Sequence, residues 1–104
     1  MRDAYIVSPV PIPGRRRNKL DSKDTLPYTQ LSFLLSTAVE KTVNLEKKHV
    51  ENIMVGCSFP EAEQGLNIGR VASRMAGFPV ETTGATVNRF CSSGLEAIAL
   101  ASLR

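Results

Sequence analysis

Apolar residues in this sequence gather in short clusters that alternate with longer stretches in which they recur every three or four positions. The short clusters are rich in β-branched or aromatic residues and lie between turn residues, which predicts strands at residues 4–7, 53–55 and 82–87, the first two of them buried. The periodic stretches predict helices at residues 31–42 and 66–76, and a third helix from Ser92 onward. Strands that alternate with helices favour a layered α/β fold with at least partly parallel pairing.

The ends of the first two predicted helices carry recognisable signals. Pro27 is tolerated in the first turn of a helix, and Asn44 is a plausible stop for the same one. Gly77 stands where helices commonly end in left-handed backbone, and Pro79 prevents continuation. The buried face of the second helix is expected to consist of Ile68, Val71, Ala72 and Met75.

The third predicted helix is apolar on nearly every face, which predicts burial on every side. It reaches Arg104 without a Gly, Pro or Asn to end it. Three short strands and two other helices do not easily enclose such a helix. We therefore expect residues 1–104 to form an incomplete N-terminal domain of a larger protein.

The composition, 42% hydrophobic and 22% charged, is that of an ordinary globular domain. No apolar run approaches the ~20 residues of a membrane span, and no signal peptide is recognisable, so a cytoplasmic location is expected. The net charge of +3 arises near the N-terminus, where Arg15, Arg16 and Arg17 form a basic cluster. A solvated loop is the favoured interpretation of this cluster. A nucleic-acid-binding module remains an alternative, although no aromatic residues interleave with the arginines.

Cys91 is the strongest candidate for a chemically reactive side chain. It lies between a predicted strand and a helix start, where free backbone N–H groups favour the reactive thiolate. Ser92, Ser93 and Gly94 are small enough to leave the sulfur open to a substrate and to let N–H donors approach a developing oxyanion. The alternative, a cysteine that serves as a small buried hydrophobe, stays open on placement alone.

Residues 87–98 read Val-Asn-Arg-Phe-Cys-Ser-Ser-Gly-Leu-Glu-Ala-Ile, a run that resembles the active-site signature of thiolases almost residue for residue. Further similarity to thiolases lies in residues 2–7, 53–56, 64–70 and 76–79. One departure is Pro11 and Ile12, where many thiolases have an arginine and a threonine before the proline. The resemblance implies the N-terminal part of a thiolase-like layered α/β fold, with a mixed sheet and a buried helix that follows the nucleophile.

The resemblance also implies an acyl-CoA acyltransferase that works by ping-pong transfer. Cys91 would accept the acyl group, and its backbone N–H would contribute to an oxyanion hole. Coenzyme A thioesters are the implied substrates, with no separate cofactor and no metal. The family's other catalytic parts, a Gly-His-Pro histidine, a second cysteine and an Asn-Glu-type motif, lie in the C-terminal half and have no match here. We therefore expect this chain to be inactive alone, and the full-length enzyme to be a homodimer or homotetramer.

Two other readings of the chain remain. A ketoacyl synthase or a hydroxymethylglutaryl-CoA synthase shares the fold and the cysteine, although residues 88–95 fit those enzymes less well. A truncated, non-catalytic piece that serves in assembly is the alternative outside enzymology. His49 is expected to be a solvated surface residue rather than the general base, and Cys57 a packed thiol rather than a second catalytic group.

Overall fold

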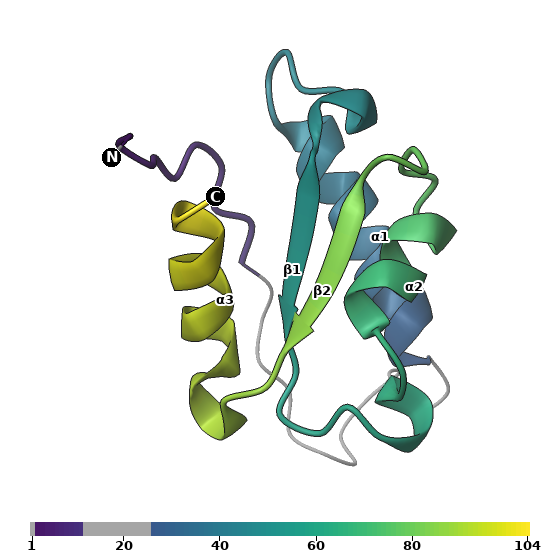
Figure 1. The fold of residues 1–104 in the computed structure, drawn as a ribbon. Helices are drawn as coiled ribbons and strands as arrows, with labels where there is room; N and C mark the ends of the chain where they lie inside the picture. The colour runs from purple at the N-terminus through teal and green to yellow at the C-terminus, as the bar shows by residue number, and fades with distance from the viewer. Residues whose placement is uncertain (1, 12–25) are drawn as a thin grey trace.

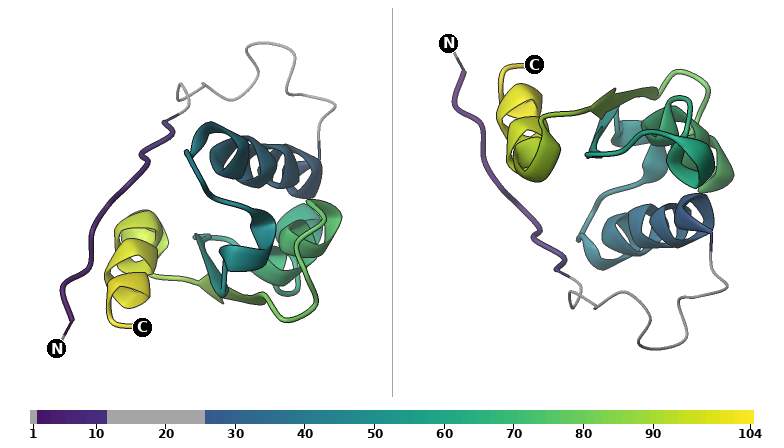
Figure 2. Two further views of the ribbon diagram at one scale, coloured as in Figure 1. Left: turned by 90° about the horizontal axis from the view of Figure 1, so that it is seen from above. Right: turned by 90° about the horizontal axis from the view of Figure 1, so that it is seen from below.

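A computed structural model of the protein describes residues 2–11 and 26–104, so Ile12 and the basic cluster at residues 15–17 lie outside the described residues. The main elements are α1 (Pro27–Lys41), β1 (Asn52–Gly56), α2 (Ile68–Met75), β2 (Thr83–Val87) and α3 (Ser93–Ser102). Single turns of 3-10 helix occur at Lys47–His49, Ala62–Gln64 and Phe90–Ser92. Helices α1 and α2 cover one side of the sheet and α3 covers the other, as Figure 1 and Figure 2 show.

The two strands of the described sheet run parallel, because α2 carries the chain from the end of β1 back to the beginning of β2. Their register pairs Asn52 with Thr83 and Gly56 with Val87. The N–H of Cys57 extends this ladder by donating to the carbonyl of Val87 at 2.9 Å. Parallel pairing brings the carboxyl ends of both strands to one edge of the sheet. The predicted parallel α/β arrangement is confirmed.

The main hydrophobic core lies between α1, β1 and the end of α2. Its buried members are Val39, Ile53, Ala76 and Phe78, with Leu35, Leu45, Val50 and Val55 packed partly buried against them. Leu35 and Val39 lie one turn apart on α1, so the predicted apolar stripe of this helix does face the core. The ends of α1 also agree with the sequence, because Pro27 is its first residue and Asn44, with φ of 60°, lies just beyond its last turn.

A side-chain cap fixes the start of α2. The Oδ1 atom of Asn67 accepts the N–H of Arg70 at 3.2 Å, which satisfies one of the free donors of the first turn. The preceding Leu66 has φ of 58°, outside the right-handed helical region. For that reason α2 begins at Ile68, two residues later than predicted.

The end of α2 is a left-handed glycine cap, as the sequence predicted. Gly77 has φ of 77°. Its N–H donates to the carbonyl of Arg74 at 3.1 Å, and the N–H of Phe78 donates to the carbonyl of Ser73 at 3.1 Å. These two hydrogen bonds form a Schellman motif. The motif turns Phe78 into the core, where it is 2% exposed.

The strand predicted at residues 4–7 is absent, and this expectation was wrong. Tyr5, Ile6 and Val7 have no strand assignment and are 79%, 77% and 81% exposed. Figure 2 shows the N-terminal segment running along the side of α3 that faces away from the sheet, where Ala4 and Ile6 line a hollow together with Ile98. A strand requires a neighbouring strand for its N–H and C=O groups, and this segment has none beside it in the described residues.

The buried face of α2 differs from the predicted one. Ile68 and Ala72 are buried as expected, but Met75 is 53% exposed and Ser73 is fully buried in its place. The reason is that α2 packs against both α1 and the sheet, so its buried surface is wider than a single apolar stripe. The hydroxyl of Ser73 donates to the carbonyl of Arg70 at 2.8 Å, which satisfies it inside the core.

Helix α3 is buried on one side only, contrary to the expected burial on every side. Ser93 and Ala97 are its buried residues, whereas Leu95 and Ile98 are 72% and 58% exposed. The sheet covers the side that faces β1, and on the opposite side the described chain places only the extended N-terminal segment, which leaves Leu95 and Ile98 largely exposed. An apolar surface therefore remains open along α3.

Candidate active site

Cys91 lies in the turn that joins the end of β2 to the start of α3. β2 ends at Val87, the 3-10 turn Phe90–Ser92 contains the cysteine, and α3 begins at Ser93. Cys91 is exposed, whereas Cys57, which directly follows β1, is buried. The thiol of Cys91 is therefore open to a ligand and lies beside the first N–H groups of a helix. Its predicted position between a strand and a helix start is confirmed.

The backbone of this turn is bent at Phe90, which has φ of 47° in the left-handed region. Left-handed backbone costs a residue other than glycine about 1–3 kcal/mol, and it persists where the surroundings hold it. One such contact comes from Asn88, whose Oδ1 accepts the N–H of Phe90 at 2.9 Å. The strained residue immediately precedes Cys91, so the direction in which the chain enters the helix depends on this bend.

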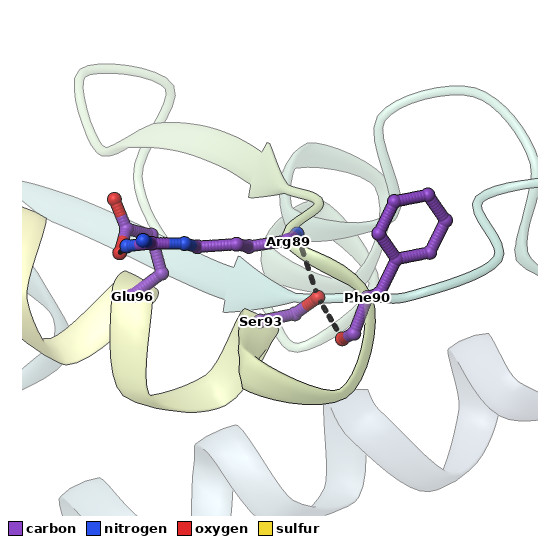
Figure 3. Close-up of polar contacts among 4 residues, drawn as sticks. All are labelled: Arg89, Phe90, Ser93 and Glu96. Atoms are coloured by element: carbon purple, nitrogen blue, oxygen red, sulfur yellow. Dashed lines mark hydrogen bonds and ion pairs between the residues drawn. The ribbon is translucent and has the colours of Figure 1, made fainter.

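The hydroxyl of Ser93 bridges two backbone groups of the turn, as Figure 3 shows. Its Oγ accepts the N–H of Arg89 at 2.9 Å and donates to the carbonyl of Phe90 at 2.6 Å. Ser93 is only 4% exposed. Loss of the hydroxyl would remove both of these hydrogen bonds from the turn, although the Phe90 carbonyl would still accept the backbone N–H of Ser93.

An ion pair spans the outer side of the same turn. Nη1 of Arg89 lies 2.5 Å from Oε2 of Glu96 on α3. The Arg89 side chain is 68% exposed, so solvent screens the pair and its contribution to stability is at most about 1 kcal/mol. Figure 3 shows the Arg89 side chain and the Phe90 ring extending to opposite sides of Ser93.

The end of β1 provides the surface on which α3 begins. A Cβ atom built on Gly56 would lie 2.5 Å from the backbone nitrogen of Gly94 and equally close to the carbonyl oxygen of Ser93. No side chain fits between the strand and the helix at this point. The absence of a Cβ at Gly56 therefore allows the start of α3, and with it the Cys91 turn, to lie against the sheet edge.

Cys57 is a packed thiol and His49 is a surface residue, as the sequence predicted. Cys57 is 6% exposed, and its Sγ donates to Oε1 of Gln64 at 3.6 Å. His49 is exposed, and its Nδ1 accepts the N–H of Glu46 at 3.2 Å. His49 precedes β1 while Cys91 follows β2, so the length of a parallel strand, roughly 16 Å for five residues, separates the ends at which they lie. The structure does not bring His49 to Cys91.

A hollow of about 590 Å³ lies at the other flank of β2. Its lining residues are Pro60, Leu66, Asn67, Gly84, Ala85, Thr86 and Asn88. Asn67 already donates to the carbonyl of Gly84 at 2.8 Å and accepts the hydroxyl of Thr86 at 2.7 Å. The polar atoms of Asn67 are thus occupied within the protein.

Sequence reasoning missed the positions that hold the turn. It treated Ser93 only as a small residue near sulfur, and it treated Gly56 only as the residue after a strand. The available signal for Gly56 was a glycine at the end of a buried strand, which often marks a close backbone approach. No sequence signal indicated that the Ser93 hydroxyl would bond backward to Arg89 and Phe90.

The described residues contain neither a metal-binding cluster nor a helix that could span a membrane. Among residues 2–11 and 26–104, no three His, Cys, Asp or Glu side chains are grouped so that they could hold a metal ion. Within the same part of the chain, no helix has both the length and the apolar character that crossing a membrane demands.

Comparison with known proteins places this geometry in a family. Residues 6–103 match the family described as thiolase, N-terminal domain. The 3-ketoacyl-CoA thiolase of Bacillus subtilis is 36% identical over 102 residues, and the Beta-ketoadipyl-CoA thiolase of Acinetobacter baylyi is 32% identical over 108 residues. Each match covers 98% of this chain but only 26% and 25% of the respective relative, so the chain spans about a quarter of their length.

A solved structure shows the same fold. The crystal structure of Acat5 thiolase from Ascaris suum in complex with coenzyme A aligns with a TM-score of 0.74 and 22% sequence identity. The alignment covers 82% of this chain and 22% of that one. The layered α/β fold expected from the sequence is that of a thiolase N-terminal domain.

Proposed function

This chain belongs to the thiolase family through its N-terminal domain, and from that premise we propose that Cys91 accepts the acyl group in an acyl-CoA acyltransferase. The observation that carries the proposal is the placement of Cys91, an exposed thiol in a bent turn at the start of α3. Outside its own stretch of helix, no described atom lies within 4 Å of where a Cβ of Gly94 would be, so the start of α3 is open at this point.

The proposed reaction in the cleavage direction begins with attack of the Cys91 thiolate on the C3 carbonyl of a 3-oxoacyl-CoA. The C2–C3 bond breaks, its electron pair stays on C2 as the enolate of acetyl-CoA, and a proton delivered to C2 releases acetyl-CoA. The shortened acyl group remains on sulfur as a thioester. The thiol of coenzyme A then loses its proton, attacks this thioester, and leaves as acyl-CoA while Cys91 returns to the thiolate. No oxidation or reduction occurs, so we propose no cofactor beyond the coenzyme A thioesters themselves.

The names of the two relatives favour this direction. Both are named for 3-ketoacyl or β-ketoadipyl thioesters, which are substrates of cleavage. In each half of the reaction, negative charge develops on the attacked carbonyl oxygen. Backbone N–H donors already fixed near that oxygen stabilise it without reorganisation, and we assign one such donor to the N–H of Cys91.

The general base and the group that moves the proton at C2 are proposed to lie outside residues 1–104. His49 is at the wrong end of the sheet, and Cys57 is buried in a contact with Gln64. We propose that residues 1–104 act as the N-terminal domain of a longer enzyme, that a C-terminal thiolase domain supplies both groups, and that the enzyme assembles as a homodimer or homotetramer. Relatives about four times as long as this chain support the part of the proposal that concerns a longer enzyme.

The test is brief exposure of the longer enzyme to acetyl-CoA, followed by mass spectrometry of its peptides. The acyl adduct should appear on the peptide that contains Cys91 and should be missing from the Cys91→Ala variant. Cys57→Ala is the matched control and should still be acylated. Acylation at Cys57 with Cys91 untouched would overturn the proposal.

A further inference from the structure

Ser93 has a hydroxyl that the proposed reaction does not use, although it lies two residues after the nucleophile. Resting on the proposed role of Cys91, we propose that Ser93 is a positioning residue, whose hydroxyl holds Phe90 in left-handed backbone and thereby sets the place of the Cys91 sulfur. Ser93 does not contact substrate in this proposal. It acts through the turn.

The left-handed backbone of Phe90 requires contacts that stabilise it. Phe90 has φ of 47°, a conformation that aromatic residues rarely adopt without outside constraint. Its ring is 71% exposed, so among the described residues the packing of the side chain does not supply that constraint. Hydrogen bonds to the backbone must supply it instead.

Two side chains, Asn88 and Ser93, form hydrogen bonds that could stabilise this backbone. Asn88 accepts the N–H of Phe90, but Asn88 is exposed and water competes for the same group. Ser93 is 4% exposed and bonds on both sides of the bend, to the Arg89 N–H and to the Phe90 carbonyl. A buried hydroxyl with two satisfied bonds resists exchange with water. The Ser93 hydroxyl therefore holds the bend from a buried position, together with the backbone N–H of Ser93, which donates to the same Phe90 carbonyl.

Ser93 itself is fixed relative to the sheet. Gly56 at the end of β1 leaves no space between the strand and the Ser93 backbone. The hydroxyl thus ties the backbone of Phe90 to the edge of the sheet. The bend at Phe90 in turn determines where Cys91 lies at the start of α3. A displacement of the sulfur by about 1 Å would be enough to lower the rate of acyl transfer by about a hundredfold.

The expected result for Ser93→Ala in the longer enzyme is a fall in kcat for thiolysis of acetoacetyl-CoA by about tenfold to a hundredfold, with KM changed less than about threefold. The matched control is Ser102→Ala. Ser102 lies on the same helix, and its hydroxyl donates to a carbonyl three residues earlier, that of Ala99, at 2.7 Å. This variant should keep kcat within about twofold, because the bond lies far from Cys91.

A double-mutant cycle separates positioning from packing. Glycine adopts left-handed backbone readily, so Phe90→Gly removes the strain that Ser93 is proposed to hold. In the Phe90→Gly background, the loss of kcat caused by Ser93→Ala should shrink to less than about threefold. An equal loss in both backgrounds, or a loss confined to KM, would overturn the positioning role.

Folding and the underlying function are controlled separately. If Ser93→Ala does not fold, the proposal requires that Ser93→Ala combined with Phe90→Gly folds and turns over like Phe90→Gly alone; failure of both variants to fold overturns it. Cys91→Ala reports on the function itself. Turnover retained in Cys91→Ala defeats the proposed function, whereas an inactive Cys91→Ala without coupling between positions 90 and 93 defeats only the role of Ser93.

Discussion

At the scale of single residues, the two cysteines differ in their access to solvent. Cys57 is 6% exposed and bonded to Gln64, while Cys91 is exposed at a helix start. We expect iodoacetamide at neutral pH to alkylate Cys91 well before Cys57, because a reagent reaches an exposed thiol directly and a buried one only after local opening. Peptide mass spectrometry over time measures both rates.

The control for this labelling experiment is the same chain in urea, where both thiols are open and should react at similar rates. Equal rates in the folded protein would show that the turn neither exposes nor activates Cys91.

Gly56 gives a second prediction at this scale. In Gly56→Ala, the new Cβ would lie 2.5 Å from the nitrogen of Gly94, so strand and helix must separate. Overpacking of this kind costs about 1–3 kcal/mol, and we expect a lower Tm. Gly94→Ala is the matched control, since no described atom lies within 4 Å of its Cβ position, and alanine favours a helix over glycine. A Tm that falls equally in both variants would contradict the close approach at Gly56.

The sequence located Cys91 but not the residues that hold it. A strand end followed by small residues and an apolar helix is visible in local sequence, and so is the resemblance to the thiolase signature. The contacts of Ser93 and Gly56 depend on β1 lying beside the start of α3, which joins positions 56 and 93 across a long stretch of chain. Local patterns carry no information about such approaches.

At the scale of elements, the Schellman motif at the end of α2 can be tested by substitution. Gly77 has φ of 77°, and the atom nearest to its Cβ position is Lys47 Nζ at 3.7 Å, so space is not limiting. Gly77→Ala should therefore destabilise the protein through the backbone alone, by about 1–2 kcal/mol. Gly77→Asn should lose less, because asparagine tolerates left-handed backbone. Thermal unfolding of the two variants measures the difference, and equal losses would point to a cause other than φ.

The elements themselves were predicted with uneven success, for physical reasons. α1, β1, β2 and the glycine end of α2 follow from local periodicity and turn chemistry, and all four are found. The prediction of a strand at residues 4–7 was wrong because an apolar run becomes a strand only where it lies beside another strand, and this segment lies along α3. Met75 failed because periodicity indicates one apolar face, while α2 packs against both a helix and the sheet.

For the whole molecule, the exposed side of α3 leads to a prediction about the isolated chain. Leu95, Ile98 and Leu103 are 72%, 58% and 72% exposed. A contiguous apolar surface of this kind favours association, so residues 1–104 alone should form concentration-dependent oligomers in size exclusion. They should also show no measurable thiolysis, because a base and a proton-moving group are each worth about a hundredfold to ten-thousandfold in rate.

A charged residue on the same side tests the cause. Ile98→Lys should shift the isolated chain toward monomer, whereas Val43→Lys, at a position that is 85% exposed and follows α1, should not. A similar effect of both variants would show that net charge, rather than the α3 surface, controls association. A compact monomer that turns over substrate and loses turnover in Cys91→Ala would contradict both expectations.

The parallel register of β1 and β2 also has a consequence for the order of folding. Helices α1 and α2 can form from neighbouring residues within microseconds, but Asn52 pairs with Thr83 only after the intervening chain has closed a long loop. The contact of α3 with Gly56 likewise joins residues far apart in the chain, so we expect it to form late. We therefore expect the Cys91 turn to be among the last parts to take shape, so that a nascent or partly folded chain carries the thiol without its catalytic setting.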